Sequence, residues 1–197
     1  MKTLIFGGTF NPPHLGHERM VGLAEAALHP DRFLIIPTCL PPHKELAAGS
    51  PAPEERLALC KAAFGNCPYV TVSDLELRRG AVSYTADTLA ELRALFPDDE
   101  FYLLLGSDSF LIFPRWRRFE EILRTCTLLV VSREEGERER LLRAAEDYRT
   151  GYGANSVLLP ADPFVLSSSE IRGGDFSEQT LSKPVLDYIL EHHLYGK

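Results

Sequence analysis

The chain has 197 residues, of which 45% are hydrophobic and 25% are charged, a composition typical of one globular domain and unlike that of disordered or fibrous proteins. Its formal net charge of −7 argues against general affinity for nucleic acid or for an anionic membrane surface. Its longest apolar runs are strand-sized, far below the roughly 18 consecutive apolar residues of a membrane-spanning helix. We therefore expect a cytoplasmic protein that binds neither nucleic acid nor membrane.

Short apolar segments alternate with longer segments of helical period along the whole chain. The predicted strands are, in chain order, residues 2–6, 32–37, 69–72, 100–106, 127–132 and 156–159. The predicted helices are residues 15–28, 54–64, 85–96, 119–125, 135–148 and 184–193. The strands are apolar on both faces, as buried parallel strands are, and right-handed crossovers place helices on both sides of the sheet. The sequence thus predicts an α/β fold with a doubly wound parallel sheet, forming one domain over residues 1–197.

A glycine-rich turn follows the first predicted strand and leads into a helix, and we call residues 7–17 the histidine loop. Glycines allow a backbone to approach a ligand closely, and the N-terminus of the next helix offers N–H groups to an anion. His14 and His17 are three residues apart, so both side chains can face one phosphate. Gly16, between them, removes a side chain where a ligand needs room. Doubly wound folds bind nucleotides at this first turn.

The histidine loop resembles the G-G-x-F-x-P-x-H-x-G-H signature of the nucleotidyltransferase superfamily, which has a Rossmann-like fold. The resemblance implies that a substrate phosphate attacks the α-phosphate of ATP in line and that pyrophosphate leaves with Mg²⁺, without a covalent enzyme intermediate. It assigns contact with the α-phosphate to His17 and support of the departing phosphates to His14. It also places three neighbours with ATP, namely Gly8, Thr9 and Phe10.

Two further segments resemble the nicotinate mononucleotide branch of this superfamily. The sequence Pro41-Pro42-His43-Lys44 lies in a long proline-rich loop, and the resemblance implies that Lys44 faces substrate phosphate and assists the reaction. The sequence Ser83-Tyr84-Thr85 resembles the branch's S-Y-T element, in which the backbone near Thr85 meets the pyridine carboxylate. From the residues alone, Lys44 is a surface charge, and Ser83 or Thr85 is a helix cap.

The end of the fourth predicted strand resembles the family's G-x-D element, which implies that Gly106 and Asp108 contact the ribose of ATP. Capping of a helix by Ser107 or Asp108 is the structural alternative. Trp116 follows eight residues later, where family members stack an indole on the pyridine ring. The next residue is often Tyr or His in relatives and is Arg117 here, so a backbone N–H contact is expected and a side-chain role stays open.

A serine-rich segment near the C-terminus, residues 166–172, resembles the I-S-S-T-x-I-R motif that holds ATP phosphates. The resemblance gives this role to Ser168, Ser169 and Arg172, while capping of a helix by a serine is the structural alternative. Arginine binds phosphate in a fork geometry. The motif belongs to a C-terminal helical portion of about residues 165–197, whose last helix we expect to be structural.

Together these resemblances imply an enzyme of NAD biosynthesis that joins ATP to nicotinate mononucleotide, giving deamido-NAD and pyrophosphate. Phosphopantetheine adenylyltransferases and cytidylyltransferases share the two histidines, and an inactive nucleotide-binding regulator is the non-enzymatic alternative. Four dispersed cysteines lack the spacing of a zinc site, so we expect no protein metal site, and the resemblance implies that Mg²⁺ enters bound to ATP. The sequence leaves open whether the chain forms a homo-oligomer.

Overall fold

The computed structural model describes residues 1–42, 46–132, 136–159 and 166–197. Its strands are β1 (Lys2–Gly8), β2 (Arg32–Pro37), β3 (Val70–Val72), β4 (Glu100–Gly106), β5 (Cys126–Val131) and β6 (Ser156–Leu159). The longer helices are α1 (Leu15–Leu28), α2 (Pro53–Phe64), α4 (Thr85–Leu95), α6 (Phe119–Thr125), α7 (Arg138–Tyr152) and α9 (Lys183–Glu191). Short helices are α3 (Leu75–Arg79), α5 (Ser107–Leu111), η1 (Phe113–Arg115), α8 (Ser168–Arg172) and η2 (Leu194–Gly196).

The strands form one sheet in the order β3-β2-β1-β4-β5-β6. Parallel register is seen where Leu4 pairs with Tyr102, where Leu103 pairs with Leu128, and where Leu129 pairs with Val157. This order is that of a doubly wound α/β fold, which confirms the predicted fold class. Strand β1 leads into the histidine loop and β4 ends at Gly106, so both predicted ligand segments follow the carboxyl ends of strands.

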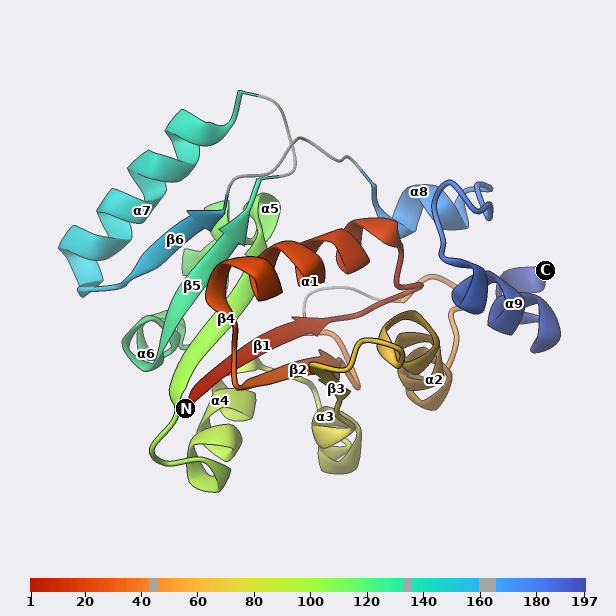
Figure 1. Cartoon of the computed structure of the whole chain (residues 1–197), viewed down its shortest axis with the longest axis horizontal. Coiled ribbons are helices and arrows are strands. Elements are labelled where there is room, and N and C mark those ends of the chain that lie inside the picture. Colours follow the sequence, from red (N-terminus) through yellow and green to blue (C-terminus); the bar gives the residue numbers. More distant parts are fainter. Residues whose placement is uncertain (43–45, 133–135, 160–165) are drawn as a thin grey trace. The chain divides into compact units, whose positions relative to one another are not determined.

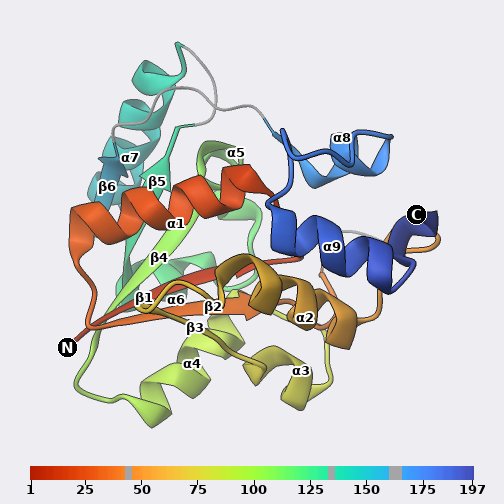
Figure 2. The same cartoon turned by 45° about the vertical axis from the view of Figure 1, so that its right-hand side comes forward.

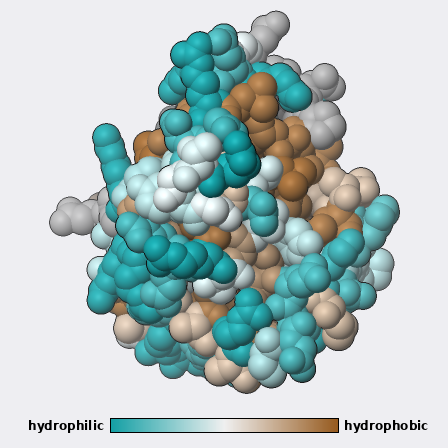
Figure 3. All heavy atoms as spheres, turned by 90° about the vertical axis from the view of Figure 1, so that its left-hand side faces the viewer, coloured by the Kyte–Doolittle hydropathy of each residue, from teal (hydrophilic) through white to brown (hydrophobic). Residues whose placement is uncertain are grey.

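The chain divides into two compact units, and β1, α1 and β2 contribute to both. Unit 1 consists of Met1–Phe6, Gly22–Phe33 and Tyr84–Val165. Its central strands β4 and β5 are almost wholly buried, and β6 is the outer strand of the sheet, with α7 beside it (Figure 1). The face drawn in Figure 3 shows hydrophobic residues, in brown, between hydrophilic residues, in teal. Large apolar side chains that stay exposed in this unit include Leu142 and Val157.

Unit 2 consists of Gly7–Val21, Leu34–Ser83 and Leu166–Lys197. Helices α2 and α9 lie side by side in it (Figure 2). Its core is a cluster of buried apolar side chains, to which α2, α8, α9 and the C-terminal turn contribute: Leu59, Ile171, Leu181, Val185, Ile189 and Leu194. The last helix is therefore a packing element, as the sequence predicted.

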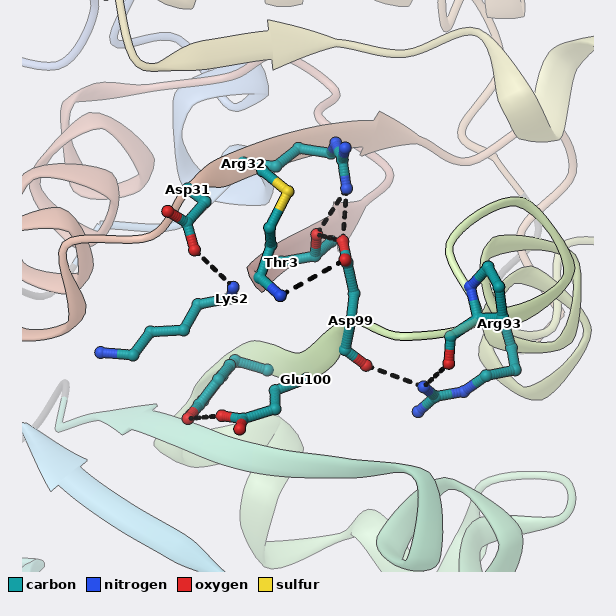
Figure 4. A network of polar contacts seen from close by, with 10 residues as sticks. Lys2, Thr3, Asp31, Arg32, Arg93, Asp99 and Glu100 are labelled. Carbon is teal, nitrogen blue, oxygen red and sulfur yellow. Dashed lines mark hydrogen bonds and ion pairs between the residues drawn. The ribbon is translucent and has the colours of Figure 1, made fainter.

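A polar network joins the amino ends of β1, β2 and β4 in unit 1 (Figure 4). Asp99 is 9% exposed and accepts a 2.6 Å hydrogen bond from Thr3 Oγ1 and a 2.5 Å contact from Arg32. The N-terminal ammonium of Met1 lies 3.6 Å from the same carboxylate. The Thr3 hydrogen bond, together with the two cations, lowers the pKa of Asp99. The carboxylate thus fixes the start of β1 to the turn before β4.

The longer elements agree with the sequence prediction to within four residues at each end, and the largest difference is the end of α7 at Tyr152, where residue 148 was predicted. The other differences are at short helices. Helices α3 and α5 were not predicted, because each spans only five residues and therefore shows no helical period. Helix α7 begins at Arg138, and residue 135, where its start was predicted, lies outside the described residues. Over the described part of the chain, no helix is long and apolar enough to cross a membrane. The expectation of a single domain stays a prediction.

Candidate functional site

The two histidines of the histidine loop lie against each other in unit 2. His14 precedes α1 and is 1% exposed, whereas His17 lies in the first turn of α1 and is half-buried. Their ring centroids are 3.7 Å apart. The ring of Phe10 packs edge-on against His17 at 5.1 Å. Both histidines therefore lie on one side of the loop, as predicted, and the apolar ring of Phe10 packs against the more exposed His17.

The hydrogen bond between the two histidines defines the protonation of His17. The backbone N–H of His14 donates to Nδ1 of His17 at 3.2 Å. A neutral imidazole carries one proton, and a nitrogen that accepts a hydrogen bond does not hold it. Nε2 of His17 therefore carries the proton and is a hydrogen-bond donor. In this form Nε2 can donate a hydrogen bond to a phosphate oxygen.

Two glycines make room for these rings. A Cβ at Gly16 would lie 3.0 Å from Cε1 and Nδ1 of His14, and a Cβ at Gly8 would lie 3.0 Å from the ring of Phe10. Real Cβ atoms rarely approach another group so closely. A glycine at position 16 thus leaves room for the ring of His14. The sequence suggested a different reason for this glycine, namely room for a ligand.

Arg56 on α2 is a buried cation beneath the histidine loop, and sequence reasoning missed it. Its side chain is fully buried, and its two terminal nitrogens donate to the carbonyl oxygens of Thr9 and Cys39, each at 2.8 Å. Burial lowers the pKa of this guanidinium, although arginine stays protonated in proteins. Arg56 therefore ties the loop after β1 to the end of β2. Its place on the buried face of α2, three and four residues before Leu59 and Cys60, was the available signal.

Helix α8 docks the serine-arginine motif onto the histidine loop. Ser167 caps the helix, since its side chain accepts from the N–H of Glu170 and the Glu170 carboxylate accepts in return from the Ser167 N–H. Ser168 Oγ donates to the carbonyl oxygen of Pro12 at 2.9 Å. The capping expected of a serine is thus present at Ser167, and the next serine holds the loop.

Arg172 donates three hydrogen bonds, one to the histidine loop and two to α8. Nη1 donates to the carbonyl oxygens of Asn11, at 2.5 Å, and of Ser168, at 3.1 Å, while Nη2 donates to Ser169 Oγ at 3.1 Å. A guanidinium has five N–H donors. Among the described residues no acceptor is shown for the Nε–H and one Nη2–H, so bracing the loop and binding a phosphate are compatible.

The predicted residues of unit 1 lie at the starts of two helices. Gly106 is the N-cap residue of α5, and Asp108 follows in its exposed first turn. Gly106 has no side chain to cap this helix, and capping by Ser107 or Asp108 stays a prediction. Thr85 is the first residue of α4, and its N-cap Tyr84 gives no side-chain cap either. The N-cap residue of α4 thus leaves the first N–H groups of this helix without a cap from its own side chain.

The tryptophan segment lies beside this helix start. Trp116 is half-buried and packs against Phe113 at 4.9 Å between ring centroids. The exposed guanidinium of Arg117 lies 4.5 Å from the ring centroid of Tyr84. Arg118 pairs with Asp87 of α4 at 2.6 Å. Arg117 therefore places a positive charge next to the start of α4, a direction that the sequence alone did not give.

The proline-rich loop is described only in part. Lys44 lies outside the described residues. Ser83, which the sequence presented as a helix cap or part of the S-Y-T element, accepts through Oγ from the backbone N–H of Cys39 at 3.0 Å. Over the described ranges, no three side chains among His, Cys, Asp and Glu are grouped so as to hold a metal ion.

Comparisons with known proteins agree with this arrangement of motifs. A sequence profile of the cytidylyltransferase-like family matches residues 5–174. A protein of Dehalococcoides mccartyi (strain CBDB1) named "Probable nicotinate-nucleotide adenylyltransferase" is 36% identical, with 99% of this chain and 97% of its own covered. A protein of the same name from Geotalea daltonii is 35% identical, with 100% and 99% covered.

Solved structures show the same fold. A structure described as "Plasmodium falciparum nicotinic acid mononucleotide adenylyltransferase complexed with NaAD" has a TM-score of 0.81 with this chain at 19% identity, covering 99% of this chain and 97% of its own. A second structure of that protein, complexed with APC, has a TM-score of 0.78. At this level of identity the likeness establishes the fold alone.

Proposed function

The chain belongs to the cytidylyltransferase-like family and to the nicotinate-nucleotide adenylyltransferases, and from this membership we propose that it transfers the adenylyl group of ATP to nicotinate mononucleotide. The products are deamido-NAD and pyrophosphate, and the reaction is a step of NAD biosynthesis. The observation that carries the proposal is the hydrogen bond that makes Nε2 of His17 a donor. A donor of this kind stabilises the negative charge that grows on a phosphate during transfer.

The reaction joins two phosphates and needs no base from the protein. A phosphate oxygen of the mononucleotide forms a bond to the α-phosphorus of ATP, and the bond from that phosphorus to the oxygen bridging to the β-phosphate breaks. The attacking phosphate is already ionised, so the enzyme contributes position and charge. We assign to His17 Nε2–H a hydrogen bond to an oxygen of the α-phosphate. His14 supports the departing pyrophosphate and the position of His17.

The other residues of unit 2 fit the binding of the ATP phosphates. Arg172 retains two N–H donors after bracing the loop, which suits an anion with several oxygens. Ser168 and Ser169 lie with it on α8. We assign the backbone of Gly8, Thr9 and Phe10 to contacts with ATP. Lys44 remains a proposed contact for the phosphate of the mononucleotide.

The residues of unit 1 fit the nucleoside ends of the substrates. Gly106 and Asp108, where β4 meets α5, are assigned to the adenosine ribose. The N–H groups at the start of α4, at Thr85, suit a carboxylate because a helix N-terminus attracts anions. Trp116 offers an aromatic face to the pyridine ring. Arg117 adds a positive charge beside Tyr84.

The proposed substrates are MgATP and nicotinate mononucleotide. Mg²⁺ prefers oxygen ligands and is commonly bound through nucleotide phosphates, so it enters with ATP. The net charge of −7 is unfavourable for nucleic acid and for anionic membranes, and a cytoplasmic location is proposed. Analytical sedimentation measures whether the chain forms a homo-oligomer.

Replacement of His17 tests the proposed role of the histidine pair. His17→Ala lowers kcat by roughly 100-fold or more while the Kd of ATP changes little, because the donor acts in the transition state. Pyrophosphate release with nicotinate mononucleotide, phosphopantetheine and no acceptor measures the effect and the acceptor class together. An active His17→Ala variant would remove His17 from its role. If pyrophosphate were released only with phosphopantetheine, then phosphopantetheine and not nicotinate mononucleotide would be the acceptor.

A further inference from the structure

Asn11 lies in the histidine loop, and both ends of its side-chain amide are engaged. It is 4% exposed. The hydroxyl of Tyr195 donates to Asn11 Oδ1 at 2.8 Å, and Asn11 Nδ2 donates to Ser50 Oγ at 2.8 Å. Tyr195 is 184 residues away in the sequence and Ser50 is 39 residues away. The amide is thus fixed in one orientation from two distant parts of unit 2.

The backbone of the same turn is held as well. The carbonyl oxygen of Asn11 accepts from Arg172, and the next carbonyl oxygen, that of Pro12, accepts from Ser168 Oγ. The turn is therefore anchored by its side chain to the C-terminal end and by its carbonyl groups to α8. A buried amide that is hydrogen-bonded at both its oxygen and its nitrogen is costly to disturb.

A stiff connection leads from this turn to the histidines. Pro12 and Pro13, both buried, separate Asn11 from His14. Proline fixes its φ angle near −65°, so few backbone rotations are available between the two residues. The position of Asn11 therefore restricts where the N–H of His14 can point. That N–H is the donor to Nδ1 of His17.

We propose that Asn11, held by the hydroxyl of Tyr195, is a positioning residue for His17. It keeps the N–H of His14 on Nδ1 of His17 and so keeps the proton on Nε2, the nitrogen that meets the α-phosphate. The inference rests on the proposed function for the last step only, since the hydrogen bonds themselves belong to the protein without substrate. Burial raises the pKa of Tyr195, which keeps its phenol protonated and a donor.

Two substitutions separate this role from general packing. Tyr195→Phe removes one hydroxyl and keeps the ring, which packs against Phe176 at 5.4 Å. Tyr188→Phe is the matched control, because Tyr188 of α9 stacks on His192 and its hydroxyl donates to none of the described residues. Tyr195→Phe lowers kcat by roughly 3- to 10-fold and Asn11→Ala by roughly 10- to 100-fold, the range for a misplaced catalytic group. The control keeps the wild-type kcat, and the Kd of ATP stays within about 3-fold in all three.

The decisive experiment combines a mutant cycle with a measurement that needs no activity. If Asn11 acts through His17, adding Asn11→Ala to His17→Ala lowers kcat no further than about 2-fold, whereas independent effects multiply. Nitrogen-15 NMR of the histidine side chains, assigned with His17→Ala, reports the tautomer directly. We expect the Nε2–H form of His17 in the wild type and in Tyr188→Phe, and a mixture of tautomers in Tyr195→Phe and Asn11→Ala. An unchanged tautomer in both variants, or multiplied effects in the cycle, would overturn the proposal. If the wild type has no activity but the two variants still show the change of tautomer relative to it, only the proposed function would be overturned.

Discussion

Substituting Gly16 by alanine tests whether the packing of His14 sets the activity. The new Cβ would lie 3.0 Å from Cε1 and Nδ1 of His14 and 3.5 Å from Cβ of Leu166. Comfortable contacts between such atoms are about 3.5–4.0 Å, so the His14 ring must move by roughly 0.5–1 Å. The ring is 1% exposed and lies 3.7 Å from the ring of His17, so the displacement reaches His17.

The expected loss follows from the tolerance of catalytic geometry. Active groups must be held within about 0.5 Å, and a 1 Å displacement costs roughly 100-fold in rate. Gly16→Ala therefore lowers kcat by roughly 10- to 100-fold at saturating MgATP and mononucleotide. The gain in helix propensity of about 1 kcal/mol offsets part of an overpacking cost of about 1–3 kcal/mol. The fall in Tm is then at most roughly 8 °C.

Gly22→Ala in the same helix is the control. Gly22 is exposed and a Cβ there meets nothing within 4 Å. The substitution stabilises the helix by about 0.5–1 kcal/mol and leaves kcat unchanged. Thermal unfolding and steady-state kinetics on both variants give the answer. A Gly16→Ala enzyme with the kcat of the wild type would refute the argument that the His14 ring must stay where it is.

Two further predictions concern stability. Arg56→Met keeps an unbranched side chain but ends before the guanidinium, and it leaves the carbonyl groups of Thr9 and Cys39 without their donor. It therefore lowers the free energy of unfolding by about 2–4 kcal/mol. A denaturant midpoint equal to that of the wild type would contradict this. Asp99 has a folded-state pKa below its ordinary 3.8, so its stabilising effect is present above about pH 4 and is lost as the pH falls through the folded pKa. The stability difference between the wild type and Asp99→Asn is therefore largest at pH 5–7 and shrinks below about pH 4. A difference that stays constant from pH 7 to about pH 2.5 would show that ionisation of Asp99 plays no part.

The sheet was predictable because each strand carries its own signal. Strands β2, β4 and β6 begin and end at the predicted residues, since a short run that is apolar on both faces is recognisable without its neighbours. The same holds for α1 and α6, which also match. The short helices α3, α5, η1 and η2 escaped prediction because three to five residues complete too little of a helical period.

The contacts around the histidine loop were predictable only in part. The histidine pair and the serine-arginine segment were found, because their residue types stand together in the sequence. The partners of Arg56 and Asn11 come from distant segments, so no local pattern reveals them. Ser83 illustrates the same limit, because its hydroxyl pairs with the N–H of Cys39, which is 44 residues away. Long-range hydrogen bonds of this kind follow from the fold rather than from sequence spacing.

The central claim is that the chain adenylylates nicotinate mononucleotide, and one assay tests it most directly. The products formed from MgATP with nicotinate mononucleotide or nicotinamide mononucleotide are separated and quantified, giving kcat/KM for each. We predict deamido-NAD and pyrophosphate in equal amounts and a preference for the acid of roughly 100-fold. Two charge-assisted hydrogen bonds of about 1.5–3 kcal/mol each suffice for that ratio, and an amide leaves at least one donor unpaired. Equal efficiency, or a preference for the amide, would contradict the assignment of nicotinate, and the absence of any dinucleotide would contradict adenylyl transfer to this acceptor.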